Sequence, residues 1–323
     1  MIRSTKILLI ISAALLIVGA GIFIGAMAFI NWDFGKLSNA KYETNTYDIN
    51  QSFENLSVDG ETDAISFVLS EDKKCRVVCH ELENMKHTVN VNNNTLEVKV
   101  KDTREWYEHI VFFSFESPKI SVYLPKEKYS SLVINADTGA IDIPGSFSFD
   151  KIDISSSTGN VACSASSKGL TRISLSTGNI NINGVSSGEF DLTTSTGAIR
   201  MESVSSEGKI GSKVSTGKTF LTDVSCKSLE SKGNTGNIYL KNVTASGAFS
   251  IERSTGDVEF DGSDADEITV KTSTGDVRGT LKSEKVFLTD TSTGWINVPK
   301  TTSGGRCEIT TSTGKIDIAI LKE

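Results

Sequence analysis

The chain has 323 residues, of which 38% are hydrophobic and 23% charged, and its formal net charge is -7. This composition supplies enough apolar side chains for a folded core and excludes global disorder. The acidic balance and the lack of any basic run argue against nucleic acid as a partner, because phosphate binding needs a concentrated basic face. The length alone allows two domains or one elongated array.

Residues 7–30 form an uninterrupted run of uncharged, mostly apolar residues. At about 1.5 Å of rise per residue, such a helix spans a hydrocarbon core of about 30 Å, so we expect a transmembrane helix here. Arg3 and Lys6 precede the run and Asp33 follows it, which predicts a cytoplasmic N-terminus and an extracytoplasmic body. The alternative is a cleaved signal peptide, because Ala26-Met27-Ala28 has the small-x-small form of a cleavage site.

Residues 48–131 show the alternation of β-strands, for example at 65–69 and 95–100, but lack the motif that follows. Asn92-Asn93-Asn94 lies between two such strands and indicates a hairpin. We therefore predict an N-terminal β cap region, built from atypical rungs that close one end of an array. The polar segment 31–47 is predicted to be a stalk after the helix, and residues 1–6 are predicted to be a cytoplasmic tail.

The five cysteines are odd in number and match no zinc-binding spacing, so a disulfide framework is not expected. Cys75 and Cys79 bracket a predicted strand, which separates them by roughly 13 Å at about 3.3 Å per residue and prevents a bridge between them. We interpret both as small apolar side chains, with a redox or metal role as the alternative. The remaining cysteines are Cys163, Cys226 and Cys307.

An aromatic cluster follows at residues 106–115. Its members are Trp106, Tyr107, Phe112, Phe113 and Phe115. Two interpretations stay open: packing in a core, or an exposed surface for a ligand or partner.

Ten Thr-Gly pairs recur in the C-terminal part, always 19 or 20 residues apart. The glycines are Gly139, Gly159, Gly178, Gly197, Gly217, Gly236, Gly256, Gly275, Gly294 and Gly314. A fixed period of this length marks one supersecondary unit per repeat, which must stack on its neighbours to bury its apolar face. Glycine adopts positive φ without a Cβ clash, so we interpret each Ser-Thr-Gly as a structural corner between two strands.

Apolar residues alternate with polar ones on both sides of each corner, which is the signature of strands with one buried face. After the glycine, the expected inward pairs include Ile141/Ile143, Val161/Cys163, Ile180/Ile182, Ile199/Met201, Ile238/Leu240, Val258/Phe260, Ile296/Val298 and Ile316/Ile318. Before it, they include Leu132/Ile134, Ile152/Ile154, Phe190/Leu192, Phe249/Ile251 and Ile268/Val270. The predicted fold is therefore all-β: residues 132–323 form a parallel β-solenoid of about ten rungs, preceded by one transmembrane helix.

Some residues interrupt the apolar pattern. Polar or small residues take inward positions at Thr219, Ser212, Ser231 and Gly279, and Arg253 lies just before a corner. We expect local bulges or bound water at these places.

No motif for catalysis is found. Asp137-Thr138-Gly139 copies the triplet of aspartic proteases, but it is the first corner of the repeat and its counterparts carry Ser or Asn. Serine-histidine chemistry is unsupported, because every histidine lies before the repeats; these are His80, His87 and His109. We therefore predict no catalytic residue, cofactor or metal, and no enzyme activity.

Calcium binding is the remaining ion chemistry to weigh. Acidic residues follow the corner glycine only at Asp257 and Asp276. On adjacent rungs these two could hold one weakly bound ion. We interpret them instead as solvated surface residues.

The N-terminal anchor, the Val-Tyr-Leu-Pro strand at residues 122–125 and the repeated Ser-Thr-Gly corners together resemble the bacterial putative-adhesin family of β-strand repeat proteins, including LiaG-like cell-envelope proteins. The resemblance covers nearly everything after residue 48. It implies a β-solenoid with a surface or envelope role and no known catalytic residues. We therefore expect a non-enzymatic, adhesin-like or envelope-stress protein of the cell membrane that binds a cell-wall polymer or a surface protein. The alternative is a polysaccharide-acting β-helix enzyme, which would need clustered carboxylates on successive rungs.

Overall fold

The computed structural model describes residues 3–33, 41–102 and 116–321. One helix, α1 (Arg3–Phe29), opens the chain. Its segment Thr5–Phe29 is long and apolar enough to cross a membrane. The aromatic cluster at 106–115, His109 and part of the expected stalk lie outside the described residues.

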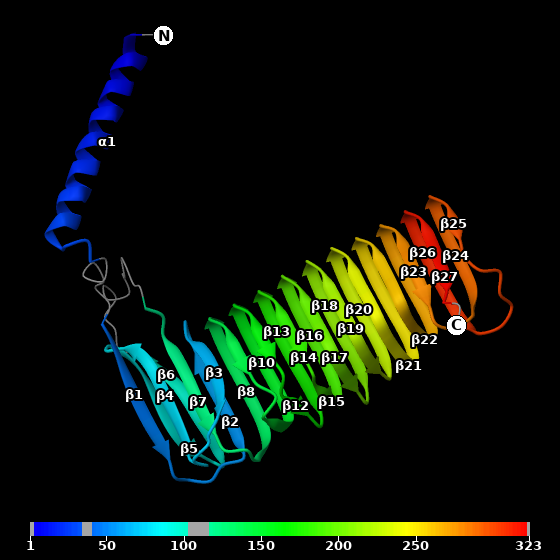
Figure 1. The fold of residues 1–323 in the computed structure, drawn as a ribbon, viewed down its shortest axis with the longest axis horizontal. Helices are drawn as coiled ribbons and strands as arrows, with labels where there is room; N and C mark the ends of the chain where they lie inside the picture. The colour runs from blue at the N-terminus through cyan, green and yellow to red at the C-terminus, as the bar shows by residue number, and fades with distance from the viewer. Residues whose placement is uncertain (1–2, 34–40, 103–115, 322–323) are drawn as a thin grey trace.

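The described strands form a β-solenoid, parallel except for three strands at its N-terminal end, in which the strands lie side by side along one long axis (Figure 1). Each rung contributes one strand before its corner and one after it. The strands before the corners are β6 (Thr95–Asp102), β2 (Asn55–Gly60), β8 (Lys128–Thr138), β10 (Ser148–Thr158), β13 (Leu170–Thr177), β16 (Glu189–Thr196), β18 (Lys209–Thr216), β20 (Ser228–Thr235), β26 (Gly305–Thr313) and β24 (Lys285–Thr293). The strands after them are β7 (Lys119–Leu124), β3 (Ala64–Leu69), β9 (Ile141–Ile143), β11 (Val161–Cys163), β14 (Ile180–Asn183), β17 (Ile199–Ser206), β19 (Thr219–Cys226), β23 (Val277–Leu281), β27 (Ile316–Ile320) and β25 (Ile296–Asn297).

Two long strands run through the bend from one rung to the next: β21 (Ile238–Thr255) and β22 (Val258–Thr274). Two short strands, β12 (Ser166–Ser167) and β15 (Ser186–Ser187), lie on a further narrow side. The predicted all-β solenoid is therefore confirmed.

The interior consists of apolar columns in register. Ile180 pairs with Ile199, Ile199 with Thr219, and Thr219 with Ile238, and all three isoleucines are fully buried. Burying such side chains contributes about 1.5 to 3 kcal/mol each and offsets the chain entropy of ordering the rungs. One continuous hydrophobic core runs from Leu56 to Ile318.

All ten corner glycines have positive φ, between 125° and 157°. They also stack on one another. A Cβ on Gly217 would overlap the carbonyl oxygen of Gly197 on the neighbouring rung, and the same holds along the column. Glycine is therefore required at the corner both for the backbone conformation and for the close approach of successive rungs.

At the C-terminal end, the spatial order of the rungs differs from their order in the sequence. Strand β26 lies between β22 and β24, and β27 lies between β23 and β25. The final rung in space is therefore β24/β25, and the last strands of the described chain are inserted beneath it. This corrects the expectation that Ile296 faces a buried interior, since it is 43% exposed in a rung on whose outer side no described strand pairs.

A similar inversion occurs at the N-terminal end. The β6/β7 rung lies outside the β2/β3 rung, although it follows it in the chain. Beyond it come three antiparallel strands: β5 (Met85–Asn92) pairs with β6, β4 (Cys75–Leu82) with β7, and β1 (Tyr42–Ile49) with β4. The tight turn from β4 into β5, across which only Leu82 and Met85 pair, forms a short hairpin at this end of the core, and β5 and β6 form the longer hairpin predicted at Asn92-Asn93-Asn94.

Four of the residues that interrupt the apolar pattern form one hydrogen-bonded group in the interior. Buried Arg253 donates from Nη2 to Ser231 Oγ at 2.8 Å and to Thr219 Oγ1 at 3.3 Å, and Ser212 donates to Ser231. Burial lowers the pKa of Arg253 to about 10. Strand pairing around Ser212 and Ser231 is regular. Of the five positions at which a bulge or water was expected, only Gly279 lies next to a register shift, which occurs in its partner strand between Phe260 and Ser263.

Candidate functional sites

At five corners the residue after the glycine is Asn or Asp, and its side chain accepts a hydrogen bond from a backbone amide of the next rung. Asn237 Oδ1 accepts a hydrogen bond from the Asp257 amide at 3.0 Å, and Asp257 Oδ1 accepts one from the Asp276 amide at 2.9 Å. Asp276 Oδ1 in turn accepts from the Lys315 amide at 2.8 Å. These two aspartates thus satisfy backbone donors of the next rung, as Asn179 does for Ala198. Their position has a structural explanation that requires no ion.

A groove of about 700 Å³ lies on the outer surface of the strands that precede the corners. We call it the lysine groove; it is defined by Lys213, Lys232, Lys271, Glu252 and Glu308. Register pairing places Lys213, Lys232, Glu252 and Lys271 on four successive rungs. Because rungs are spaced at about 4.8 Å, the groove presents a row of charges along the long axis, and Arg253 lies at its floor.

The lysines of this groove differ in their partners. Lys232 pairs with Glu230 at 2.7 Å, and Glu230 also pairs with Lys209 at 2.9 Å. Lys213 and Lys271 form no ion pair within the described residues and are exposed. Two cations are therefore available to an anionic ligand that lies along the groove.

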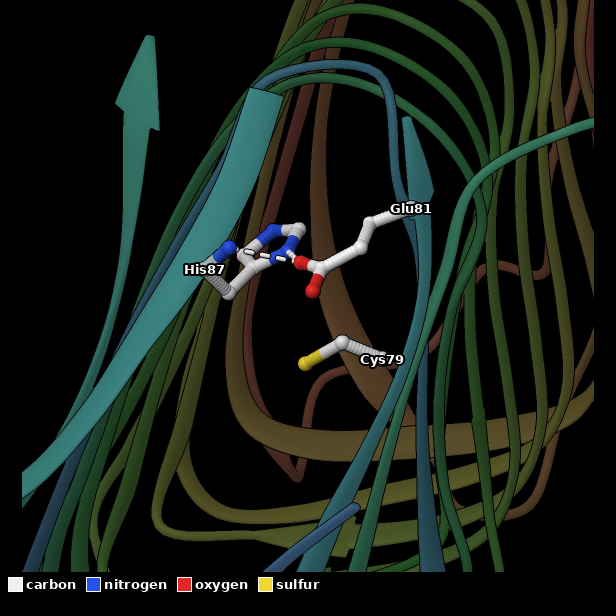
Figure 2. Close-up of side chains that lie close together, drawn as sticks. All are labelled: Cys79, Glu81 and His87. Atoms are coloured by element: carbon white, nitrogen blue, oxygen red, sulfur yellow. Dashed lines mark hydrogen bonds and ion pairs between the residues drawn. The ribbon is translucent and has the colours of Figure 1, made fainter. Parts of the chain in front are cut away.

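A second candidate site is buried behind the N-terminal hairpin. Figure 2 shows Cys79 and Glu81 of β4 and His87 of β5 pointing toward one another. Their ligand atoms all lie within 4.8 Å of one another. Together with Asp63, which precedes β3, we call them the hairpin cluster; every member is buried.

The two ring nitrogens of His87 face two different carboxylates. Nδ1 lies 2.5 Å from Glu81 Oε2, and Nε2 lies 3.4 Å from Asp63 Oδ2. Burial acts to lower the pKa of His87, but contact with Asp63 and Cys79 outweighs it and raises that pKa to about 10. Glu81 is further held by Asn45 Nδ2 at 2.7 Å and by the His87 amide at 2.6 Å. Two buried atoms have no hydrogen-bond partner: Asp63 Oδ1 and His87 Nε2.

Sequence reasoning interpreted Cys79 as an apolar side chain, with a redox or metal role as the alternative, and did not bring it together with Glu81 and His87. The signal was present in the alternation of β4, where Cys75, Val77, Cys79 and Glu81 all take inward positions. A carboxylate that faces the interior needs a hydrogen-bond or ion-pair partner, because burying an unpaired charge is costly. His87 follows Met85 in the same inward phase of β5.

The other residues weighed for chemistry are apart from one another. Asp137 is exposed at the first corner. His80 is held by Glu116 at 2.8 Å and stacks on Tyr42. The five cysteines are free and buried, and burial raises the pKa of Cys75 to about 12.

Comparison with known proteins identifies the family to which the repeat belongs. The family model described as Toastrack DUF4097 matches residues 53–218 and 209–323. Among solved structures, a putative adhesin from Parabacteroides distasonis has 12% identity and a TM-score of 0.46, covering 87% of this chain and 98% of that chain. A putative adhesin from Bacteroides fragilis has 13% identity and a TM-score of 0.39, covering 86% and 97%. A putative lipid binding protein from Parabacteroides distasonis has 16% identity and a TM-score of 0.41, covering 75% and 98%. No curated protein matches the sequence.

Proposed function

This chain belongs to the Toastrack DUF4097 family, and from that premise we propose that it is a non-enzymatic, membrane-anchored envelope protein. In this proposal α1 is the anchor, the N-terminus is cytoplasmic, and the extracytoplasmic solenoid binds an anionic cell-wall polymer. The observation that carries the proposal is the lysine groove, in which Lys213 and Lys271 are exposed and form no ion pair with any residue that the structure describes.

The geometry favours a repetitive ligand. A polymer with regularly spaced phosphates or carboxylates, lying along the solenoid axis, meets Lys213 and Lys271 three rungs apart, which is about 14 Å at about 4.8 Å per rung. The net charge of -7 repels polyanions elsewhere on the molecule, so binding concentrates at the groove. A surface protein with an acidic edge would use the same cations and is the other ligand class consistent with this site.

The direct experiment is co-sedimentation of the full chain, solubilised in detergent, with purified cell wall. We expect the protein to pellet with intact wall and to stay in solution with wall stripped of its anionic polymers. Failure to bind either wall or any isolated surface component would refute the proposal. For the anchor, we expect the chain at its uncleaved mass in the membrane fraction; a shortened, soluble form would instead indicate a signal peptide.

A second candidate function is polysaccharide cleavage, because Glu252 and Glu308 line the same groove. Register pairing places them two rungs apart, which is roughly 10 Å along the axis at about 4.8 Å per rung. Glycosidases separate their two carboxyl groups by about 5 to 9.5 Å. This separation favours binding over hydrolysis, and release of reducing ends from wall glycans that is lost in Glu252→Gln would reverse that preference.

A further inference from the structure

The hairpin cluster has the composition of a metal site. It combines one thiol, one imidazole and carboxylates in a volume that excludes water: Cys79 and Glu81 are 0% exposed, and His87 is 4% exposed. Thiolate and imidazole ligands favour Zn²⁺ and its neighbours among the transition metals, whereas Ca²⁺ and Mg²⁺ prefer all-oxygen sets.

The local backbone sets the geometry. Cys79 and Glu81 are two residues apart on β4 and therefore lie on the same face of the strand. β4 joins β5 through the Leu82↔Met85 pair, which brings His87 across from them. The three ligand atoms lie within 4.8 Å of one another before any ion is bound.

The hairpin cluster also contains polar atoms that lack a hydrogen-bond partner among the described residues. His87 Nε2 and Asp63 Oδ1 are buried without a hydrogen-bond partner, although buried polar groups are nearly always paired. The carboxylates of Asp63 and Glu81 both face the single imidazole of His87. The described residues around them supply no buried cation, because Asn45 is neutral and Lys86 pairs with Glu43 at the surface. A divalent ion bound on the Nδ1 side would leave Nε2–H to donate to Asp63, as in the carboxylate–histidine–metal arrangement of many zinc sites.

We propose that the hairpin cluster binds one divalent transition-metal ion, Zn²⁺ by its ligand chemistry. Cys79 Sγ, Glu81 and His87 Nδ1 are the ligands, and Asp63 orients the imidazole from its other nitrogen. In the exchange the ion displaces two protons, one from the Cys79 thiol and one from the hydrogen bond between His87 Nδ1 and Glu81 Oε2, and both pass to solvent. No electron is transferred. The ion would tie the cap hairpin to the first rungs.

The test uses the full chain in detergent, freed of metal by a chelator and then titrated with Co²⁺, with unfolding and refolding in Co²⁺ as a second route into the buried site. We expect one Co²⁺ per chain, a thiolate-to-cobalt charge-transfer band in the near ultraviolet, and displacement of Co²⁺ by Zn²⁺. Cys79→Ser is expected to lose the band. The matched controls Cys163→Ser, a buried thiol in the solenoid, and His80→Ala, a partly exposed histidine outside the cluster, are expected to keep it.

The variant Asp63→Asn tests whether Asp63 orients the His87 imidazole without itself ligating the ion. It is expected to keep the band but to bind about 10- to 100-fold more weakly. Far-ultraviolet circular dichroism confirms that each variant retains the β fold. The proposal is overturned if the wild-type chain takes up no Co²⁺ by either route, or if the double variant Cys79→Ser/His87→Ala binds as tightly as wild type. Unchanged affinity in Asp63→Asn would overturn the orienting role.

Discussion

The guanidinium of Arg253 lies in space that Gly233 leaves free on the preceding rung. A Cβ on Gly233 would lie 3.0 Å from Arg253 Nη1 and 2.8 Å from the Val214 carbonyl oxygen. Both distances are shorter than a normal van der Waals contact. The glycine before one corner and the arginine before the next are therefore one structural unit, although they are twenty positions apart in a repetitive sequence.

Gly233→Ala tests this unit. The added methyl group has to displace the guanidinium or the Val214 backbone, so we expect a loss of about 1 to 3 kcal/mol in the free energy of unfolding, measured by urea denaturation. Gly211→Ala is the matched control, because a Cβ there would lie 3.4 Å from its nearest neighbour. Equal stability of the two variants would contradict the account.

Arg253 itself is predicted to be replaceable, but only together with its partners. Arg253→Met leaves Thr219 without its buried donor and leaves Ser231 with only the hydrogen bond from Ser212, and each unsatisfied group costs about 1 to 3 kcal/mol. The quadruple variant Arg253→Met/Thr219→Val/Ser231→Ala/Ser212→Ala removes the polar side chains together, and it is expected to be at least as stable as wild type. Thermal unfolding of the two variants measures the difference; a quadruple variant no more stable than the single one would show that the charge itself is required.

The corner glycines are predicted to be intolerant of any side chain. Gly217→Ala combines a φ of 143° with overlap between the new Cβ and the Gly197 carbonyl oxygen. We expect a loss of about 3 kcal/mol or more, beyond the 1 to 3 kcal/mol of backbone strain alone. The melting temperature checks this, again with Gly211→Ala as the reference.

Glu230 gives the solenoid surface a pH dependence. Its hydrogen bonds to Lys232 and Lys209 lower the pKa of Glu230 to about 2 from an ordinary 4.5. A carboxyl group with a lowered folded-state pKa stabilises the protein above its unfolded pKa, and this stabilisation is lost as the pH falls through the folded value. Because the pair is on the surface, the effect is about 1 kcal/mol at most.

We therefore expect Glu230→Gln to be slightly less stable than wild type at pH 7 and equal to it near pH 2. Melting temperatures across this range provide the measurement. Glu207→Gln serves as the control, since Glu207 makes no ion pair within the described residues. A wild-type advantage that persists at pH 2 would show that the charge of Glu230 is not its source.

The sequence predicted the columns of the interior but not the order of the rungs at the ends. Ile180 and Ile199 lie in register as expected, because every rung repeats the same alternation. That same uniformity makes Thr274 an equally good neighbour for Thr293 or Thr313, and the structure pairs it with Thr313. Nothing in a repeated motif distinguishes the two, so the order must come from the connections between rungs.

The hairpin cluster escaped sequence reasoning for a different reason. Its residues lie in the region without the repeat, where the pairing of β4 with β5 and the position of Asp63 follow from long-range contacts. The breaks at Thr219, Ser231 and Arg253 were all visible in the sequence, but the contact of Arg253 with the other two was not, since Arg253 comes from a later rung. Positions that violate a pattern are informative individually, and only the fold shows which of them compensate each other.

The most direct test of the proposed function reverses the two free charges of the lysine groove. In the cell-wall co-sedimentation assay, Lys213→Glu/Lys271→Glu is compared with Lys218→Glu/Lys227→Glu, which makes the same change in net charge at exposed lysines outside the groove. We predict that the groove variant stays in solution while the control pellets like wild type. Equal retention of both variants on the wall would contradict the assignment of the groove as the binding site.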